Sequence, residues 1–516
     1  MNDSRSNSLG KRRMSAVPIF GNGMVLQRRK PIAVWGDSEA DSQITVTLNG
    51  RETICTAAST GKWSVQLPPM EAATGLTMKI SDHQTEIIFT DVAIGEVWLA
   101  GGQSNMEFLM KHEAERETVI LKSENSNIRF YGCPQISYEG QLKDESHSFE
   151  GIWRKADPEN TGYFSAVGYY FAQKISAYLK DIPVGIIGCY WGGSSAAAWM
   201  REEYFTDGLE FYLEERQSCK DALDIDKEFA DFKKDRIEAT SPEGRARSDN
   251  MFATPVLKPL TLEFPPEMIE KFKRTKFAPF SPFRPAGLVH TMLEKIVPYS
   301  VKGVIWYQGE EDVNHPDVYD KLFGRMIECW RELWNDKFPF IFAQLTVLNR
   351  MMLSDGNEFV PIRAMQERVS KTVPDTYMIC TMDVGMEYDI HPKHKRPVGE
   401  RMALQAIHHV YGGEILSESP EVAGASKEDG RISVKLLHCG DGLCIHDNKV
   451  DAMRLVVNGK EQKIFSVSAE GNTLIVACPA IRGDSRIELS YAQVGFCIVN
   501  IFNSAGIPVR PFQVIL

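Results

Sequence analysis

The chain lacks a long hydrophobic run. No stretch of about 18 consecutive apolar residues, the length that spans a bilayer as a helix, occurs in its 516 residues. The segment Met1–Arg13 also lacks the apolar core that a secretory signal requires. The sequence therefore predicts a cytoplasmic protein without a membrane partner.

Cysteine pairs at metal-binding or redox spacing are also missing. The ten cysteines are spread thinly along the chain, several of them within apolar, strand-like runs, and none forms a CxxC pair. This distribution favours reduced, buried thiols over a zinc site. We expect no metal and no other cofactor.

Basic residues show no surplus. The 58 Lys and Arg residues are outnumbered by 69 Asp and Glu residues, which gives a formal net charge of −11. Dense basic runs are confined to Lys11–Arg13 and Lys393–Arg396, so a nucleic-acid groove is not indicated. The hydrophobic content of 43% is that of an ordinary globular protein with a sizeable core.

Hydrophobic and polar residues alternate at period two over residues 17–93. Within this region Gln43–Leu48 runs into Asn49–Gly50 and out through Arg51–Ala57, which is a strong hairpin signal. We interpret residues 1–16 as a flexible tail and residues 17–93 as a small β-sandwich module.

From residue 94 to residue 415 the pattern changes to alternating strands and helices. This alternation predicts an α/β domain with right-handed crossovers and a parallel sheet covered on both faces. Apolar residues recur every four positions in Val167–Leu179 and Leu322–Leu333, which indicates amphipathic helices. The expected strands are Val97–Ala100, Ile128–Tyr131, Val184–Cys189, Val304–Tyr307, Phe340–Leu345 and Tyr377–Thr381.

Two further regions break this rhythm. Residues 201–300 carry a highly charged helical part around Lys220–Arg236 and a Pro- and Phe-rich part at Phe277–Arg284, so we interpret them as an insertion or lid over the sheet. Period two returns over residues 416–516, with Asn458–Gly459 as a turn. The chain is therefore expected to end in a second β module.

The most informative motif is Gly102–Met106, which reads GQSNM and follows the first expected strand. It places Ser104 on a tight turn between a buried strand and a helix, where a hydroxyl can act as a nucleophile. The alternative is a helix cap, because Ser is a preferred residue at that position. The remaining motifs decide between the two.

Three other polar motifs follow expected strands, at Tyr190–Ser195, Trp306–Glu311 and Asp389–Pro392. The carboxyl ends of parallel strands share one edge of a sheet, where ligands bind in open α/β folds. A serine, a glycine pair, an amide side chain and a histidine at one edge are the parts needed for acyl transfer.

Each of these motifs has a simpler explanation when taken alone. Gly192–Gly193 could be an ordinary turn, Gln308 a hydrogen-bonded core residue and His391 a structural histidine. Ser194, in a turn that also follows a strand, is the nearest competitor of Ser104 for the role of nucleophile. Four matches in four strand-end loops make the simpler explanations improbable together.

Five motifs of the chain resemble those of the sialate O-acetylesterase family, which belongs to the SGNH (GDSL-like) hydrolases. They are Leu99–Met106, Trp191–Ser194, Arg284–Leu288, Gly303–Glu310 and Asp389–Pro392. Phe20–Gln27 and Gly61–Trp63 also resemble the family's N-terminal β-sandwich. The resemblance implies a flavodoxin-like, three-layer α/β/α domain with accessory β modules at both ends, and the activity of a carbohydrate esterase.

The resemblance also implies roles for individual residues. Ser104 would be the nucleophile and His391 the general base. The backbone amides of Ser104 and Gly193, with the side chain of Gln308, would form the oxyanion hole, since an amide NH₂ donates without bringing a charge. The residues implied to bind substrate are Asn105, Trp191, Trp306 and Glu310.

The chain departs from the family pattern at the third catalytic residue. SGNH enzymes usually carry Asp three residues before the histidine, but position 388 is Tyr and the nearest acid is Asp389. In an extended segment a two-residue offset puts Asp389 on the same side as His391, where it could contact Nδ1. A backbone carbonyl could orient His391 instead, and both arrangements stay open.

The function predicted from these motifs is removal of O-acetyl groups from a carbohydrate by a serine esterase, with sialic acid as the first candidate substrate. An acetylesterase for plant xylan or mannan oligosaccharides would need the same catalytic parts. A carbohydrate-binding protein with an inactive hydrolase core would keep only an aromatic cleft. Intact Ser104, His391 and Gln308 argue against that last alternative.

Overall fold

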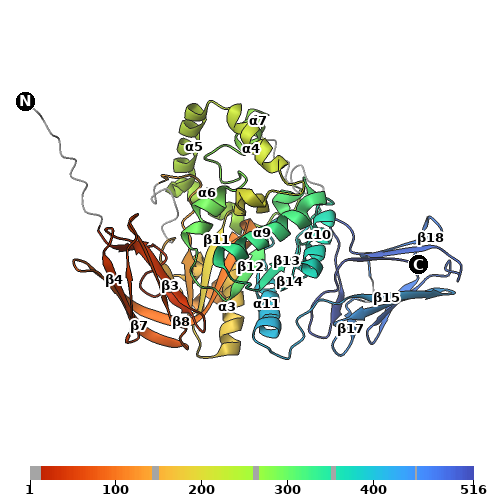
Figure 1. Cartoon of the computed structure of the whole chain (residues 1–516). Helices are drawn as coiled ribbons and strands as arrows, with labels where there is room; N and C mark the ends of the chain where they lie inside the picture. Colours follow the sequence, from red (N-terminus) through yellow and green to blue (C-terminus); the bar gives the residue numbers. More distant parts are fainter. Residues whose placement is uncertain (1–12, 142–149, 260–265, 350–355, 448–449) are drawn as a thin grey trace, which may run out of the picture.

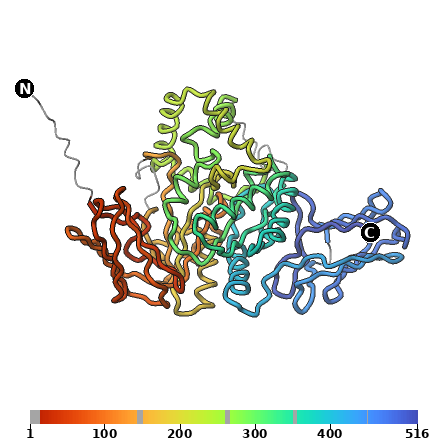
Figure 2. The backbone as a smooth tube through the Cα atoms, in the orientation of Figure 1, coloured from red at the N-terminus to blue at the C-terminus, as the bar shows by residue number. Residues whose placement is uncertain are grey.

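A central domain of mixed α/β fold lies between two β modules in the computed structural model, which describes residues 13–141, 150–259, 266–349, 356–447 and 450–516 (Figure 1). The N-terminal module lies at one side of the central domain and the C-terminal module at the other, as the backbone trace in Figure 2 also shows. Among the described residues, no helix combines the length and apolarity needed to cross a bilayer. All ten cysteines lie in the described part of the chain and are unpaired.

The central sheet is mixed. Six neighbouring strands run parallel to one another, namely β9, β11, β8, β12, β13 and β14. Strand β10, at the edge, pairs antiparallel with β9. The prediction of a purely parallel sheet is therefore wrong at this edge. In spatial order the strands are β10 (Trp153–Ala156), β9 (Asn125–Gly132), β11 (Val184–Tyr190), β8 (Glu86–Gly102), β12 (Gly303–Tyr307), β13 (Phe340–Ala343) and β14 (Thr376–Ile379).

The helices that alternate with these strands have the predicted apolar faces. α3 (Ala166–Leu179) begins after Ser165, whose side chain accepts a hydrogen bond from the Gly168 amide as an N-cap. α9 (Tyr319–Trp334) buries its apolar residues at helical spacing. Two later helices complete the set, namely α10 (Phe359–Thr372), which contacts β14, and α11 (Arg396–Gln405), which contacts α3.

Strand β8 connects the N-terminal module to the central sheet. Its first part pairs with β7 (Ala73–Ser81) and β2 (Val25–Gln27), and its second part pairs with β11 and β12. Where these parts meet, the buried Arg28 and Glu96 form an ion pair of 2.5 Å. One buried hydrophobic cluster accordingly extends through both regions.

The N-terminal module contains the predicted hairpin. Strands β4 (Gln43–Leu48) and β5 (Arg51–Thr56) pair antiparallel around Asn49 and Gly50, whose φ angles of 50° and 71° are both left-handed. Two positive φ angles in a two-residue loop match the right-handed twist of the strands. The module also contains β1 (Ser15–Ala16), β3 (Ile32–Asp37) and β6 (Lys62–Leu67), which form a three-stranded sheet.

The C-terminal module has a hydrophobic cluster of its own, to which the central domain adds Val347, Cys380 and Met382. The module contains two four-stranded sheets and one strand pair. The first sheet is β15 (Glu421–Glu428), β16 (Arg431–Leu437), β21 (Thr473–Ala477) and β20 (Ser466–Glu470). The second is β19 (Lys460–Gln462), β18 (Met453–Val457), β22 (Ile487–Tyr491) and β24 (Phe512–Ile515), and the pair is β17 (Leu443–Ile445) with β23 (Ile501–Asn503).

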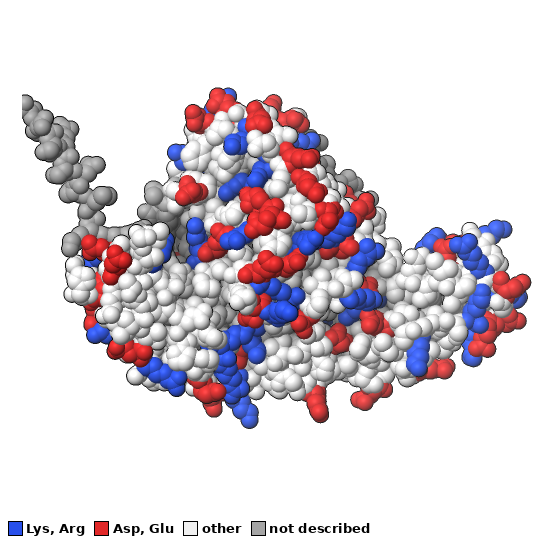
Figure 3. All heavy atoms as spheres, in the orientation of Figure 1, with Lys and Arg blue, Asp and Glu red and all other residues white. Residues whose placement is uncertain are grey.

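The predicted insertion is helical and stands above the central sheet in Figure 1. Its helices are α4 (Phe211–Asp221), α5 (Ile225–Thr240), α6 (Pro242–Ala253) and α7 (Pro266–Thr275). The face of this region seen in Figure 3 carries acidic and basic side chains side by side. The insertion thus presents charge of both signs to the solvent.

Candidate active site

Ser104 lies where β8 ends and the short helix α1 (Ser104–Glu107) begins. Gly102, at the end of the strand, has a φ of 133°, and a Cβ there would lie 2.2 Å from the carbonyl oxygen of Tyr307 in β12. Only glycine permits this approach. The residue at the N-cap of α1 is Gln103, so Ser104 does not occupy the capping position that was the alternative explanation.

Ser104 Oγ lies 2.8 Å from Nε2 of His391, which follows β14. The hydroxyl donates when the imidazole is neutral and carries its proton on Nδ1. Burial, with a contribution from the positive charges of Lys395 and Lys393, lowers the pKa of His391 to about 3. At neutral pH the ring is therefore unprotonated, as a general base must be.

An aromatic residue of the insertion packs on this imidazole. The ring centroid of Phe252, from α6, lies 4.8 Å from that of His391. His112 stacks on Phe252 with a centroid distance of 5.6 Å and an interplanar angle of 13°. Phe252 thus contributes to the apolar surroundings that keep His391 neutral.

The structure does not bring the carboxylate of Asp389 to Nδ1 of His391. One carboxylate oxygen accepts from the backbone amide of His391 at 2.9 Å. The other accepts from the amide of Val256 at 3.1 Å and lies 3.0 Å from Nζ of Lys393. Within the described part of the chain no hydrogen bond joins Asp389 to the imidazole ring. The contact inferred from strand alternation is therefore wrong, because the segment turns around the Asp389 side chain instead of extending.

Gly192, the first glycine of the predicted pair, lies against Ser104. The Gly192 amide donates to Oε2 of Glu107 at 2.6 Å, and Gly193 has a left-handed φ of 72°. A Cβ on Gly192 would lie 3.3 Å from the Cβ of Ser104. Neither the amide of Ser104 nor that of Gly193 donates to another described residue. Both predicted backbone donors are thus without a hydrogen-bond acceptor among the described residues.

Gln308 is held in the core instead. It is fully buried, and its amide NH₂ donates to Oδ2 of Asp312 at 2.5 Å and to the carbonyl of Ser194 at 3.3 Å. Its carbonyl oxygen accepts from the Tyr319 hydroxyl at 3.1 Å. Both amide hydrogens have acceptors, so the prediction that Gln308 donates to an oxyanion disagrees with the structure. Gln308 is the hydrogen-bonded core residue that was the alternative.

Two of the residues predicted to bind substrate are closed to it. Asn105 is 1% exposed, and all its polar atoms bond to protein groups. Trp306 is also 1% exposed and packs edge-on against Trp199 and Trp330. Both predictions followed from position in a motif, whereas packing directs these side chains inward.

The other two predicted substrate residues are closer to the surface. Trp191 is 6% exposed, and the guanidinium carbon of Arg236, from α5, lies 5.1 Å from its ring centroid. Glu310 is 9% exposed, and its Oε2 has no hydrogen-bond partner among the described residues. Burial raises the pKa of the Glu310 carboxyl.

Sequence reasoning missed four residues around the site, namely Glu107, Phe252, Lys395 and Arg236. Glu107 had a signal, since it lies one helical turn after Ser104. Lys395 lies four residues after His391, but the sequence gives no signal that its side chain is buried. Phe252 and Arg236 come from helices of the insertion, which lie outside its one motif, Arg284–Leu288.

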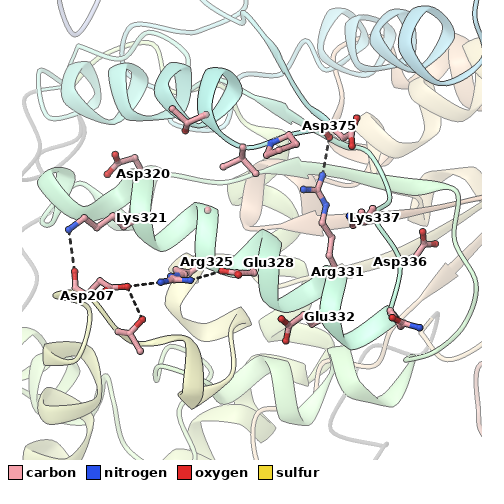
Figure 4. A pocket seen from close by; sticks show the side chains of 16 residues that line it. Asp207, Asp320, Lys321, Arg325, Glu328, Arg331, Glu332, Asp336, Lys337 and Asp375 are labelled. Atoms are coloured by element: carbon pink, nitrogen blue, oxygen red, sulfur yellow. Dashed lines mark hydrogen bonds and ion pairs between the residues drawn. The ribbon is translucent and has the colours of Figure 1, made fainter.

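A large groove lies outside this site, along α9. Its volume is about 960 Å³, and none of the predicted site residues lines it. Figure 4 shows that some of its charged side chains are paired: Arg325 pairs with Asp207 and Glu328, and Arg331 donates to the backbone carbonyl of Asp375. We assign this groove no part in the chemistry. Among the described residues no group of three or more His, Cys, Asp or Glu side chains could hold a metal ion.

Comparison with known proteins bears on the same residues. Residues 286–408, which include Gln308, Glu310 and His391, match the family model described as carbohydrate esterase, sialic acid-specific acetylesterase. The human sialate O-acetylesterase is 28% identical over 502 residues, covering 90% of this chain and 81% of that protein. The mouse sialate O-acetylesterase is 28% identical over 456 residues, covering 80% of this chain and 76% of that protein.

One solved structure is similar over almost the whole chain. A carbohydrate acetylesterase from Xanthomonas citri superposes with a TM-score of 0.73 at 26% sequence identity, covering 97% of this chain and 99% of that one. The match includes the accessory β modules as well as the central domain, and it agrees with the mixed α/β fold.

Proposed function

We propose that this chain is a serine esterase that removes O-acetyl groups from a sialic acid, since its residues 286–408 match the model of the sialic acid-specific acetylesterases and it is 28% identical to the human sialate O-acetylesterase. The observation that carries the proposal is the distance of 2.8 Å between Ser104 Oγ and Nε2 of His391 at the carboxyl end of β8. A hydroxyl and a neutral imidazole in hydrogen-bond contact are the minimal unit for nucleophilic ester hydrolysis.

The order of the strands supports a flavodoxin-like arrangement around that site. If β9 and β10 are left aside, the parallel strands lie in the order β11, β8, β12, β13 and β14, which is 2-1-3-4-5 in chain order. In such sheets ligands bind between strands 1 and 3, where the chain reverses its direction of travel. Here that position lies between β8 and β12, next to Ser104. We propose the three-layer α/β/α domain on this basis.

The first half of the reaction acylates Ser104. As Oγ attacks the acetyl carbonyl carbon, its proton passes to Nε2 of His391. The negative charge that develops on the carbonyl oxygen is stabilised by the amides of Ser104 and Gly193. The tetrahedral intermediate then expels the sugar oxygen, which takes the proton from Nε2. The products of this half are acetyl-Ser104 and the free sugar hydroxyl.

The second half restores the enzyme. His391 accepts a proton from water as the water oxygen attacks the acetyl-serine carbonyl, and the same two amides stabilise the second oxyanion. Collapse releases acetate and returns the proton to Ser104. In this mechanism Asp389 is a positioning residue, since it bonds to the backbone amide of His391 and not to the ring.

A sialic acid differs from neutral acetylated sugars by its carboxylate. Arg236, over the ring of Trp191, is a cation at the site, and its charge lowers the pKa of Glu107 against the effect of burial. A cation next to an aromatic ring suits an acidic sugar better than a neutral one. This observation favours sialic acid over acetylated xylan or mannan oligosaccharides.

A substrate panel tests the proposal. We expect acetate release from 9-O-acetylated sialic acid to exceed release from acetylated xylo- and manno-oligosaccharides, and Arg236→Gln to reduce that preference while hydrolysis of p-nitrophenyl acetate changes little. Preference for the neutral oligosaccharides would replace sialic acid by a plant polysaccharide. Binding of the sugars without acetate release would favour an inactive carbohydrate-binding protein.

A further inference from the structure

Lys395 is a buried cation immediately before α11. It is 1% exposed, and its Nζ lies 2.5 Å from Oδ1 of Asn105. The rings of Phe108 and Tyr307 lie 4.9 and 5.5 Å from the ammonium. Among the described residues no carboxylate lies within 4.0 Å of it to form an ion pair. Lysine is rarely buried in this way without a paired charge, because removing an ammonium from water costs much free energy.

The partner of Lys395 connects the two segments that carry the proposed nucleophile and base. Asn105 follows Ser104 in the chain, and its Nδ2 donates to the carbonyl of Ile390, the residue before His391, at 3.0 Å. The same nitrogen donates to Oε1 of Glu310 at 2.5 Å. Because Nζ can only donate, Lys395 requires the oxygen of Asn105 on its own side and leaves the NH₂ for Ile390 and Glu310.

We propose that Lys395 is a positioning residue for the deacetylation: its ammonium orients Asn105, which joins Ser104 to His391, and its charge disfavours a proton on the imidazole. The proposal rests on the catalytic roles proposed for Ser104 and His391. It assigns to one buried lysine both the geometry of the pair and its electrostatic surroundings.

The charged groups around Lys395 set the direction of its effect. Burial, with a contribution from Lys393, lowers the pKa of Lys395 to about 7, against the opposing effect of the carboxylates of Glu310, Asp389 and Glu113. Lys393 has its own ion pair with Asp389 at 3.0 Å. Glu113 accepts from the backbone amide of Lys395 at 3.2 Å.

A pH dependence follows from this arrangement. While Lys395 is protonated, its charge opposes the imidazolium that forms when His391 takes the serine proton. Above about pH 7 the charge is lost, the neutral amine can still donate to Asn105, and His391 becomes a stronger base. The wild-type kcat/KM is therefore expected to rise across neutral pH because of Lys395, even though His391 itself titrates far lower.

Three variants separate the two parts of the proposal. Lys395→Met removes donor and charge, Lys395→Gln removes the charge but keeps a donor, and Lys393→Met removes a neighbouring cation that does not bond to Asn105. We expect Lys395→Met to lower kcat about 10- to 100-fold, because misplaced catalytic groups lose rate steeply, with less change in KM. Lys395→Gln should retain more of kcat. Both should lose the rise of kcat/KM near pH 7, and Lys393→Met should keep it.

Stability and spectroscopy provide the other readouts. If Lys395 were merely structural, its replacement would lower the unfolding midpoint. Because Lys395→Met removes a buried charge, we expect its midpoint at pH 6 to equal or exceed that of the wild type. In proteins labelled with [¹³C]histidine, His391 should titrate at higher pH in Lys395→Met than in the wild type.

Two results would overturn the proposal. One is a Lys395→Met variant whose kcat and pH profile equal those of the wild type. The other is an unchanged His391 titration in that variant. If the wild-type protein hydrolyses no acetyl ester, the proposed function fails, and the His391 titration still tests separately whether Lys395 disfavours a proton on the imidazole.

Discussion

At the scale of the residue, Ser104 and Ser194 differ in what their hydroxyls touch. Ser104 Oγ lies at Nε2 of His391, whereas the fully buried Ser194 Oγ donates to the carbonyl of Trp191 at 2.7 Å and accepts from the indole of Trp199 at 2.9 Å. The Ser194 hydroxyl thus both donates and accepts a hydrogen bond within the core. Its role is therefore structural.

We predict that Ser104→Ala lowers kcat for p-nitrophenyl acetate by at least about 10³-fold with an unchanged unfolding midpoint, since the nucleophile is lost but no packing is. Ser194→Ala is the matched variant and should lower the unfolding midpoint, because it leaves the Trp199 indole without its acceptor. Loss of activity in Ser194→Ala but not in Ser104→Ala would show that Ser194, and not Ser104, is the nucleophile.

Asp389 gives a second prediction at this scale. Asn at this position can still accept from the amide of His391 but cannot pair with Lys393, so Asp389→Asn should lower kcat by about tenfold or less, far below the roughly 10⁴-fold loss in a triad. The double variant Asp389→Asn, Lys393→Met should recover part of the lost kcat, because it no longer carries the unpaired cation of Lys393 near His391. A loss near 10⁴-fold would show that the carboxylate reaches the ring during turnover.

The residues that the structure brings together and those that it turns away differ in how local their signals are. Ser104 follows the end of β8 and His391 lies in the loop after β14, and such strands can be located from hydrophobic pattern alone. Gln308, Asn105 and Trp306 lie in the same motifs, yet their side-chain directions depend on packing between distant segments. Proximity in sequence to a catalytic residue therefore did not predict exposure to substrate.

At the scale of the element, α6 of the insertion contacts His391, the proposed general base. Phe252 packs on the imidazole, and the Val256 amide just after the helix donates to Asp389. The sequence indicated an insertion from its charge and its Pro- and Phe-rich part, but the contact joins residues about 140 positions apart and has no local signal.

We predict that Phe252→Ala raises the pKa of His391, because a less desolvated imidazole binds a proton more readily. The acid limb of kcat/KM should therefore move to higher pH, and kcat should fall severalfold. The control is Phe272→Ala, which removes a half-exposed phenylalanine of α7 in the same insertion and should leave the limb in place. A limb that stays fixed in Phe252→Ala would mean that other groups exclude water from His391.

At the scale of the whole molecule, the two β modules relate differently to the centre. The N-terminal module shares one hydrophobic cluster with the central domain, whereas the C-terminal module is built around a second. The alternation of period two predicted both modules equally well. What periodicity could not show is which of them shares its core with the neighbouring domain.

We predict two thermal transitions, of which only one coincides with loss of activity. Leu48 in β4 and Leu489 in β22 are both fully buried, so Leu48→Ala and Leu489→Ala should each cost about 2–5 kcal/mol of local stability. Leu48→Ala should lower the transition that abolishes activity, and Leu489→Ala the other. A single transition lowered by both variants would show one cooperative unit.

The double use of β8 limits how this protein can be divided. The first half of β8, the strand that ends beside the proposed nucleophile Ser104, pairs with β7 and β2. Removing the residues before this strand would leave a row of unpaired backbone groups beside the central domain. Exposed strand edges of that kind recruit other chains. A minimal catalytic fragment beginning at residue 86 should therefore aggregate, and a soluble shortened enzyme would have to keep the N-terminal module even though that module contributes no described side chain to the catalytic pair.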